Sequence, residues 1–189
     1  MVHVLHSRPM NAVFLQGEKC DLRLLTPEDA SERYLQWFHD EETCRYNAHH
    51  QFPMTEAALR GYLDRLASSK TELILAISEK GSGRHVGNVA LQSIDWVART
   101  AELAIIVGEK DCRGKGIGRE ACRLIVRHGF GALGLNRIWL GTMAPNVGMQ
   151  RVAEELGFKR EGVLRQANFH GGAFVDGYLY GLLASEFHV

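Results

Sequence analysis

Arg113-Gly114-Lys115-Gly116-Ile117-Gly118 is the stretch that decides the fold, because it joins an apolar, strand-like segment to a helix-like one. Glycine lets a backbone approach a ligand closely, and a helix N-terminus presents N–H groups that have no acceptor within the helix. Together these features make a cradle for phosphate, to which Arg113 and Lys115 add positive charge. A flexible turn without a ligand is the alternative interpretation.

Two other phosphate-binding motifs fit this loop less well. A Walker A loop requires G-x-x-x-x-G-K-[ST], which the chain lacks. Residues 116–121 do fit the dinucleotide-binding pattern G-x-G-x-x-A. However, the preceding strand-like segment ends near Val107, and no acid closes the segment at 138–140 to bind a ribose hydroxyl. A nucleotide-binding protein is therefore a minor alternative, which cofactor preference would test.

The spacing of apolar residues predicts a mixed α/β chain on both sides of the loop. Three strands between 72 and 107 have short connections, which is typical of an antiparallel meander, and the last two strands form a hairpin across Gly171-Gly172. Thr26 is expected to cap the first helix. Strands are expected over 20–25, 72–78, 85–95, 100–107, 137–141, 158–169 and 173–183, and helices over 27–39, 55–66, 117–132 and 147–156.

The composition is that of a globular protein, with 189 residues of which 46% are hydrophobic and 23% charged. No repeat or linker divides the chain. We therefore expect one domain over 20–189, after an aperiodic N-terminal arm over 1–19 that is expected to be loose. Lys and Arg number 22, as do Asp and Glu, so no net field attracts nucleic acid or an anionic membrane.

The cysteine pattern and the hydropathy predict a cytoplasmic protein. Cys20, Cys44, Cys112 and Cys122 form no C-x-x-C pair and match no zinc spacing, so reduced thiols are expected. No apolar run approaches the roughly 18 residues of a membrane span. Residues 1–11 lack the apolar core of a signal peptide. No membrane partner is therefore expected.

Three motifs resemble one enzyme family, the GNAT acetyltransferases, over about residues 20–186. The loop fits the signature [QR]-x-x-G-x-[GA], with Arg113, Gly116 and Gly118 at the fixed positions. Asn146 followed by EELGF at 154–158 resembles a second block of that family. The third block is similar to the RimJ/RimL-like branch and consists of Glu161-Gly162, Arg165, Gly172, Asp176, Tyr180 and Leu182-Leu183.

The resemblance implies a mixed, mostly antiparallel sheet that splays at a central V-shaped cleft, with helices on both faces. It implies acetyl-CoA as co-substrate, no metal, and direct transfer of the acetyl group to a primary amine. Backbone amides of 113–118 would hold the pyrophosphate, and the strand at 105–107 would pair with the pantetheine arm. The implied cofactor-binding residues are Ile105, Ile106, Val107, Arg113, Gly114, Lys115, Gly116, Ile117, Gly118, Arg119 and Asn146.

A more specific contact with acetyl-CoA is expected for two of these residues. Asn146 matches the family position that contacts the pantetheine or the thioester region. Arg119 would reach the adenosine 3′-phosphate from the first turn of the helix. Its spacing with Arg123 and Arg127 equally fits a solvated helix face.

The acceptor amine must be neutral to attack a thioester, which gives a base a role. An α-amino group has a pKa of roughly 7.7–8.0, whereas a lysine-like amine, near about 10.4, needs a base far more. By the resemblance, Glu102 is the candidate catalytic base, because it begins the strand before the loop, where many family members carry a catalytic glutamate. A surface carboxylate at a strand edge is the alternative interpretation.

The usual acids of the family are absent. The tyrosine that protonates the leaving thiolate in many relatives corresponds to Ala153, and a common serine corresponds to Met149. Water, another side chain such as Tyr178, or no acid at all would then serve. A non-catalytic acyl-CoA-binding domain is therefore an alternative. A covalent route through Cys112 is not expected, because no histidine base is implied beside it.

By the resemblance, the acceptor pocket is lined by the loop between the first two helices and by the last hairpin. Residues 45–52 read RYNAHHQF, a run without an acid, which does not favour a polyamine. A polar surface loop is the alternative, and a metal site is not expected because adjacent histidines on an extended chain point apart. The candidate acceptor-binding residues are Asn47, His49, His50, Phe52 and Asp176, with Asn168 and His170 comparable.

The resemblance leaves the acceptor open. A protein N-terminal amine fits the RimJ/RimL-like pattern, and small-molecule amines are also acceptors in that branch. The aromatic, histidine-rich loop would suit an amino sugar or a nucleotide sugar about equally well. The chain is expected to act as a monomer or homodimer, without nucleic acid.

Overall fold

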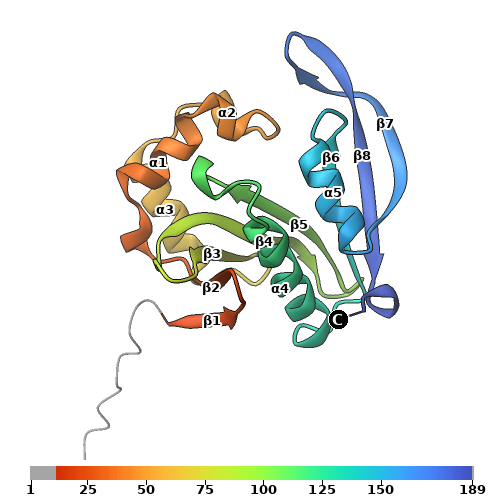
Figure 1. The fold of residues 1–189 in the computed structure, drawn as a ribbon, viewed down its shortest axis with the longest axis horizontal. Helices are drawn as coiled ribbons and strands as arrows, with labels where there is room; N and C mark the ends of the chain where they lie inside the picture. The colour runs from red at the N-terminus through yellow and green to blue at the C-terminus, as the bar shows by residue number, and fades with distance from the viewer. Residues whose placement is uncertain (1–11, 189) are drawn as a thin grey trace, which may run out of the picture.

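The computed structural model describes residues 12–188, which fold around an eight-stranded sheet (Figure 1). The strand order is β1-β2-β3-β4-β5-β6-β8-β7, and β5 with β6 is the parallel pair of an otherwise antiparallel sheet. The strands are β1 (Val13–Gln16), β2 (Cys20–Leu24), β3 (Leu73–Glu79), β4 (His85–Asp95), β5 (Thr100–Val107), β6 (Arg137–Met143), β7 (Lys159–His170) and β8 (Ala173–Leu183).

Helices cover both faces of this sheet, as expected for the fold class. The helices are α1 (Glu32–His39), α2 (Glu41–Cys44), α3 (Glu56–Leu66), α4 (Ile117–Gly131) and α5 (Val147–Glu155), with 3-10 turns η1 (Pro27–Asp29), η2 (His49–Gln51), η3 (Lys110–Cys112) and η4 (Ala184–Glu186). Among the described residues, no helix is long and apolar enough to cross a bilayer. The predicted strands and the later helices are confirmed, with ends that shift by one or two residues.

Alternate side chains of β5 pack into two different cores. Ile105 and Val107 pack against the larger core, which includes Ile117 and Ile125 of α4. Ile106 packs against the smaller core of α1 and α3 on the opposite face. This follows from the two-residue period of a strand. One strand therefore separates the α4 side of the molecule from the α1 and α3 side.

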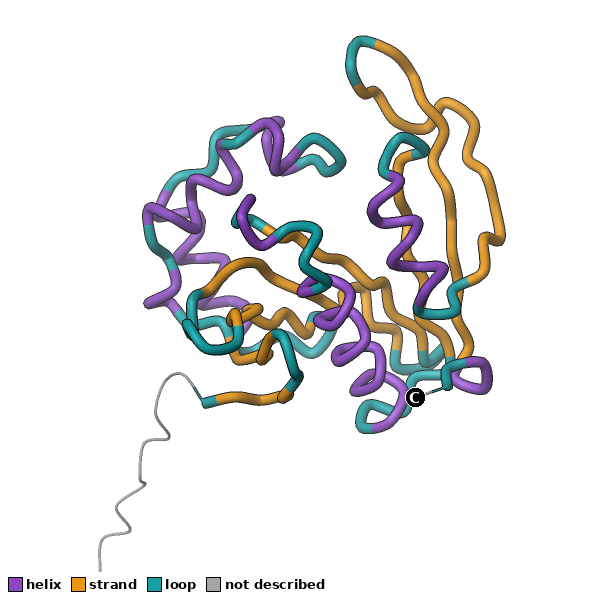
Figure 2. The backbone as a smooth tube through the Cα atoms, in the orientation of Figure 1, coloured by secondary structure: helices purple, strands orange, loops and turns teal. Residues whose placement is uncertain are grey.

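The sheet parts between β5 and β6. The two strands pair only from Thr100 with Arg137 to Glu102 with Trp139. Beyond that point, residues 103–107 pair with β4 alone and residues 140–143 with β8 alone. The two halves diverge above the last shared pair, as the parted groups of strands in Figure 2 show. The predicted V-shaped cleft is confirmed.

The first predicted helix, over 27–39, is wrong in its beginning. Residues 27–29 form a 3-10 turn, and α1 begins at Glu32 with Ser31 as its N-cap, where Ser31 Oγ accepts the N–H of Tyr34 at 3.2 Å. The Asp29 carboxylate holds the turn closed, because it accepts the N–H of Thr26 at 2.9 Å. It also binds the guanidinium of Arg23 at 2.7 Å. The sequence showed the cap residue Thr26 but not this ion pair, which interrupts the helix.

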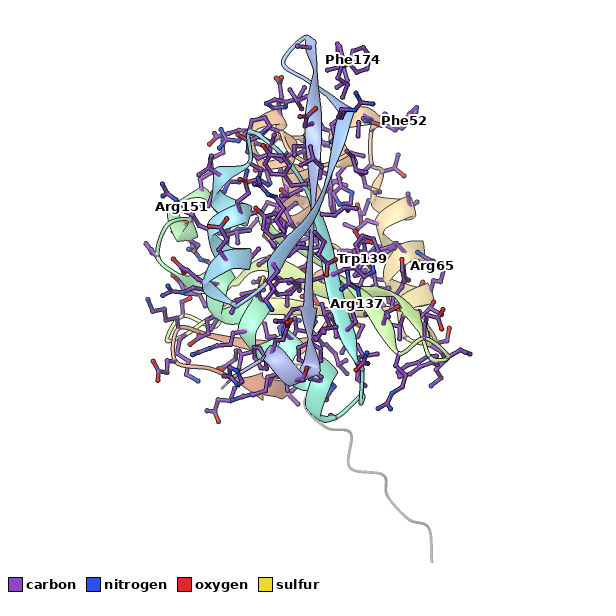
Figure 3. All side chains as sticks on the ribbon, turned by 90° about the vertical axis from the view of Figure 1, so that its right-hand side faces the viewer. Phe52, Arg65, Arg137, Trp139, Arg151 and Phe174 are labelled. Atoms are coloured by element: carbon purple, nitrogen blue, oxygen red, sulfur yellow. The ribbon has the colours of Figure 1, made fainter. Side chains whose placement is uncertain are left out.

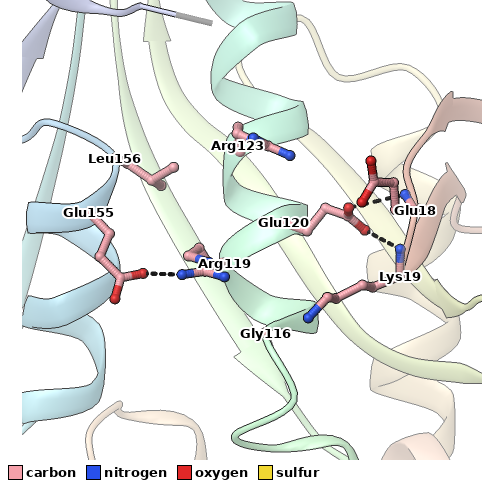
Figure 4. A pocket seen from close by; sticks show the side chains of 8 residues that line it. All are labelled: Glu18, Lys19, Gly116, Arg119, Glu120, Arg123, Glu155 and Leu156. Carbon is pink, nitrogen blue, oxygen red and sulfur yellow. Dashed lines mark hydrogen bonds and ion pairs between the residues drawn. The ribbon is translucent and has the colours of Figure 1, made fainter.

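Part of the N-terminal arm is ordered, which corrects the expectation of a loose segment over 1–19. Strand β1 pairs antiparallel with β2, with Val13 opposite Arg23 and Gln16 opposite Asp21. The turn between them is held by Glu120 of α4, whose carboxylate accepts backbone N–H groups at 3.0, 2.7 and 2.8 Å (Figure 4). These N–H groups belong to Glu18, Lys19 and Cys20. Residues 1–11 of the expected arm lie outside the described residues.

Glu120 is buried and charged at once. Burial raises the pKa of its carboxyl, but the hydrogen bonds from the three N–H groups outweigh burial, so its pKa is lowered overall. The group is therefore ionised in the folded protein at neutral pH. Buried backbone N–H groups need an acceptor, and this carboxylate serves three of them.

Replacing Glu120 with alanine is expected to destabilise the fold by about 2–3 kcal/mol, because it leaves three N–H groups without their charged acceptor. Urea unfolding of wild type and variant measures this difference. Glu18→Ala is the matched control, because Glu18 is exposed and contributes only its backbone. Equal destabilisation by both changes would contradict the assignment.

The stability that Glu120 contributes is expected to depend on pH. Since its pKa is lowered on folding, its contribution is complete above the ordinary glutamate pKa of about 4.3 and is lost as the pH falls through the lowered value. The difference in unfolding free energy between wild type and Glu120→Gln should therefore shrink between about pH 7 and about pH 3. A constant difference over that range would show that ionisation of Glu120 is irrelevant.

Candidate active site

A cleft of about 620 Å³ occupies the space between the parted strands and the loop before α4. This volume lies within the range of small-molecule sites, about 300–1,000 Å³. The cleft is lined by Lys19, Glu42, Thr43, Arg45, Tyr46, Asn47, Ile105, Ile106, Val107, Cys112, Arg113, Gly114, Lys115, Gly116, Gly118, Arg119, Cys122, Asn146, Gly148, Met149, Arg151, Val152 and Glu155. The cleft thus brings together every predicted cofactor residue except Ile117, whose side chain is buried in the core.

The glycine loop adopts the backbone that its sequence predicts. Gly114 and Gly116 have φ angles of 73° and 83°, in the left-handed region that favours glycine. Gly116 is the N-cap of α4, so the N–H groups of the following turn have no acceptor within the helix. Lys19 Nζ donates to the carbonyl of Lys115 at 3.0 Å and brings a further cation to the loop. An anion at this helix end would meet N–H groups and positive charge together.

The side chain of Arg113 has a structural role. Its guanidinium donates to the carbonyls of Val107 at 3.1 Å and Gly108 at 3.3 Å. It also donates to Thr43 Oγ1 at 2.7 Å. These contacts fasten the end of β5 to α2. The backbone N–H of Arg113 also has a partner in its own chain, because it donates to the carbonyl of Lys110 at 3.2 Å.

The edge of β5 that faces the cleft is open. Residues 103–107 have no strand partner on the β6 side. Apart from the Val107 carbonyl, which Arg113 occupies, their outward N–H and C=O groups are available to an extended, amide-containing ligand. Asn146 lies across the cleft as the N-cap of α5, where its Oδ1 accepts the N–H of Met149 at 3.2 Å. Gly118 keeps α4 close to the strand, since a Cβ there would lie 3.2 Å from Val107 Cγ2.

A smaller hollow of about 260 Å³ adjoins the outer end of the cleft. It shares Lys19, Gly116, Arg119 and Glu155 with the cleft and adds Arg123 and Glu120 (Figure 4). Arg119 Nη1 donates to Glu155 Oε2 at 2.6 Å, which links the start of α4 to the end of α5. This bond uses one of the N–H donors of the Arg119 guanidinium, whose side chain is half exposed.

Glu102 lies at the point where the strands part. It is half-buried, opposite Trp139 in the last shared pair of β5 and β6. Gln92 Nε2 donates to its Oε2 at 3.1 Å. Among residues 12–188, no side chain or backbone group hydrogen-bonds its Oε1. Glu102 does not line the cleft itself, and shares the face of β5 that carries Ile106.

Of the predicted acceptor-binding residues, Asn47 lines the cleft. His49 and His50 turn toward Phe38 instead: the ring of His49 packs on the Phe38 ring at 5.1 Å, and His50 Nδ1 lies 3.1 Å from the Phe38 carbonyl. Asp176 accepts the N–H of Gln166 at 2.8 Å and supports a bulge in β7. These three side chains are occupied by their own chain, so the structure does not bring them into the cleft.

Phe52 is 80% exposed and also lies outside the cleft. Figure 3 shows it at the same end of the molecule as Phe174, near the tip of the β7–β8 hairpin. Phe174 in turn packs edge-on against Phe169 at 5.3 Å. Exposed aromatic side chains therefore gather at this end of the molecule, outside the cleft lining.

Tyr46 is a cleft residue that the sequence reasoning did not select. Its hydroxyl donates to the carbonyl of Pro145 at 3.1 Å, and its ring packs on His170 at 5.1 Å. The Arg45 guanidinium lies 4.8 Å from the centre of the same ring. Lys19 was also missed. Arg45 and Tyr46 begin the polar loop at 45–52, so its composition could have indicated them. Lys19 lies about a hundred residues from the glycine loop that it contacts, and no local sequence pattern indicates that contact.

Ala153 and Met149 stand at the two positions where the family usually carries its acids. Ala153 is fully buried and Met149 lines the cleft. Tyr178 does not line the cleft, and its ring lies under the Arg160 guanidinium at 4.9 Å. Burial raises the pKa of the Cys112 thiol, which disfavours a thiolate there.

The family model of the acetyltransferase (GNAT) domain matches residues 20–159. The chain belongs to this family. The acetyltransferase is 25% identical over 170 residues to the uncharacterized N-acetyltransferase YoaA of Bacillus subtilis. The match covers 89% of this chain and 96% of that one. It is 34% identical over 104 residues to the putative ribosomal N-acetyltransferase YdaF of Bacillus subtilis, covering 55% and 56% of the two chains.

A solved structure shares the fold. The spermidine N-acetyltransferase of Vibrio cholerae, in complex with CoA and spermine, has a TM-score of 0.81 at 23% identity, over 90% of this chain and 98% of that one. As a member of the family, this protein is an acetyl-CoA-dependent N-acetyltransferase that transfers the acetyl group to an amine. Among the described residues, no group of three or more His, Cys, Asp or Glu is placed to hold a metal ion.

The cleft fits acetyl-CoA by its own geometry. A diphosphate requires N–H groups and cations at one point, which the α4 N-terminus, Lys19 and Lys115 provide. A pantetheine arm requires an open strand edge, which β5 provides. A Cβ at Gly116 would lie 3.0 Å from Lys19 Nζ, the end of a flexible side chain, so the left-handed backbone rather than lack of space is what favours glycine there.

Gly116→Ala is expected to lower the affinity for acetyl-CoA by about tenfold or more, because the left-handed backbone costs an L-residue roughly 1–2 kcal/mol and the loop shifts to relieve it. Titration calorimetry measures the change. Gly61→Ala is the matched control: no atom lies within 4 Å of its Cβ, and the change should stabilise α3 by up to about 1 kcal/mol without affecting affinity. Unchanged binding in Gly116→Ala would refute the cradle.

Proposed function

We propose that acetyl-CoA binds with its pyrophosphate at the N-terminus of α4 and its pantetheine arm along the open edge of β5. One observation supports this above the others: the unpaired edge at 103–107 runs directly toward the glycine loop, along one wall of the cleft. Asn146 contacts the arm from the opposite wall. Arg119 binds the adenosine 3′-phosphate from the first turn of α4.

Glu102 is the proposed base. Acetyl-CoA supplies an acetyl group activated as a thioester, and the protein must supply a neutral amine. Gln92 holds one carboxylate oxygen of Glu102 and leaves the other to accept a proton from the amine, directly or through a water molecule. The position of Glu102 at the apex of the V supports this role, because the thioester end of an arm lying along β5 would point there.

The leaving thiolate takes its proton from solvent in this proposal. A free thiol has a pKa of about 8.5, so a thiolate is a stable leaving group near neutral pH and needs little help from an acid. The open cleft admits water, and Ala153 and Met149 have no proton to give. The absence of the usual tyrosine is therefore compatible with catalysis, although it is also the feature that supports a non-catalytic acyl-CoA-binding domain.

We infer that the acceptor is the primary amine of a protein N-terminus or of a small molecule. The likeness to the putative ribosomal N-acetyltransferase supports a protein N-terminus as the acceptor. It also supports the assignment to the RimJ/RimL-like branch. The exposed aromatic side chains Phe52, Phe169 and Phe174 support an amino sugar or nucleotide sugar as the second candidate. The four described cysteines are all free and buried, which supports a reducing compartment such as the cytoplasm.

Acetyl-CoA is expected to raise the melting temperature, whereas NAD and ATP should not. A ligand at about 100 times its Kd adds roughly 2.7 kcal/mol, which corresponds to roughly 5–10 °C for a domain of this size. Differential scanning fluorimetry measures the shift. A larger shift with NAD or ATP would overturn the cofactor assignment and the roles of the loop residues.

Glu102→Gln is expected to lower kcat by about 10²–10⁴-fold for a lysine-like amine and by less for an α-amino group, because only the first depends strongly on deprotonation. The KM for acetyl-CoA should stay within about twofold. The readout is CoA release with a panel of amines. Glu28→Gln serves as control, since Glu28 is exposed in the η1 turn. An unchanged kcat would exclude Glu102 as the base, and no turnover of any amine by wild type would favour a binding domain.

A further inference from the structure

The carboxylates that line the cleft are already neutralised by the chain itself. Glu42 pairs with Lys110 at 2.8 Å and with Arg113 at 3.4 Å. Glu155 pairs with Arg119 at 2.6 Å. Within the described part of the chain, these two are the carboxylates of the cleft lining. The cleft therefore offers no uncompensated negative charge to a polycationic acceptor.

The cations of the lining are not balanced in the same way. Lys19 of the β1–β2 turn and Lys115 of the glycine loop lie where the pyrophosphate is proposed to bind, and Arg151 lines the cleft from α5. Arg45 lies on the opposite wall, after α2, in the loop that also carries Asn47. Arg45 makes no ion pair with any residue in the range 12–188, and it is exposed. Its guanidinium is thus available to a ligand.

Arg45 is held over the ring of Tyr46, 4.8 Å from its centre. That ring is itself fixed, because the Tyr46 hydroxyl donates to the carbonyl of Pro145 at 3.1 Å. His170, at the end of β7, packs on the same ring at 5.1 Å. Stacking on an aromatic ring orients a guanidinium and leaves its N–H donors free. We call this cluster of Arg45, Tyr46 and His170 the cationic stack.

The cationic stack joins the walls of the cleft mouth. Arg45 and Tyr46 follow α2, His170 ends β7 in the hairpin, and Pro145 directly precedes the Asn146 cap of α5. The nearest carboxylate on the hairpin by sequence, Asp176, accepts the N–H of Gln166 and is not paired with a cation. No carboxylate of the described residues forms an ion pair with His170. An incoming anion would therefore meet an arginine without competition.

We propose that the cationic stack is a subsite for an anionic group, a phosphate or a carboxylate, carried by the acceptor amine. This rests on the proposed function of the cleft. The planar fork of arginine binds both anions through two parallel hydrogen bonds, and these charge-assisted bonds are stronger than neutral ones. The site thus selects amines that carry a negative group a short distance from the nitrogen, and it disfavours spermidine and other polycations.

The test compares paired acceptors that differ in one anionic group. Glucosamine 6-phosphate is set against glucosamine, and a peptide that begins Ser-Asp against one that begins Ser-Asn, with spermidine as the polycation. The first pair tests a phosphate on a small molecule and the second a carboxylate on a peptide. We expect the anionic member of at least one pair to have a kcat/KM at least about tenfold higher, with spermidine the poorest acceptor. Added salt should reduce that ratio.

Arg45→Gln should bring the ratio of the preferred pair to within about twofold of one, by raising the KM for the anionic member while the neutral member keeps its KM. Arg45→Lys should give an intermediate ratio, because it keeps the charge but not the fork. Arg65→Gln is the matched control, since Arg65 lies over the ring of Tyr62 at 5.4 Å in the same manner but on α3, outside the cleft.

Three results would overturn the proposal. Equal rates within both pairs, or spermidine as the best acceptor, would refute anion selection while leaving acetyl transfer intact. A tenfold preference that survives Arg45→Gln would place the anion elsewhere and refute the cationic stack. If acetyl-CoA binds but no amine of the panel is acetylated by wild type, the proposed function fails and this proposal fails with it.

Discussion

The parting of β5 from β6 is the constraint on which the rest of the molecule depends. Parallel strands in one sheet normally continue side by side, yet here the shared ladder ends at Glu102 and Trp139. The N–H and C=O groups beyond it still need partners, and water or a ligand must provide them. Separate anchors hold the two halves: the Arg113 side chain fastens the end of β5 to α2, and α5 packs its buried Ala153 into the core beside β6. A binding cleft is the result of a sheet that is prevented from closing.

The alternation of side chains along β5 then decides what each face of the cleft can do. Ile105 and Val107 face α4 and its glycine loop, where N–H groups and cations gather. Ile106, and with it Glu102, faces the side of α1 and α3. The single strand β5 thus separates the proposed phosphate-binding surface from the Glu102 carboxylate at the apex of the V. The two substrates of a transferase can approach from different sides and meet where the strands part.

The local features of the fold and site could be predicted from the sequence, and the long-range ones could not. The glycine loop and the strands are encoded by neighbouring residues and could be predicted from the sequence. The V-shaped sheet was predicted from the family resemblance. The break before α1 depends on Arg23 meeting Asp29, and the orientation of His49 and His50 depends on Phe38. Tyr46 contacts Pro145 and His170 across about a hundred residues or more. No periodicity within a segment encodes such contacts.

The hydrogen bonds between Glu120 and the β1–β2 turn show that the folded unit begins before the residue at which the family model begins. The match of the family model begins at residue 20, whereas the Glu120 carboxylate on α4 accepts N–H groups from residues on both sides of that point. A protein cut at the similarity boundary would keep all its recognisable motifs and lose part of the support for the helix that begins the phosphate cradle. The range that the family model matches is here shorter than the unit that folds.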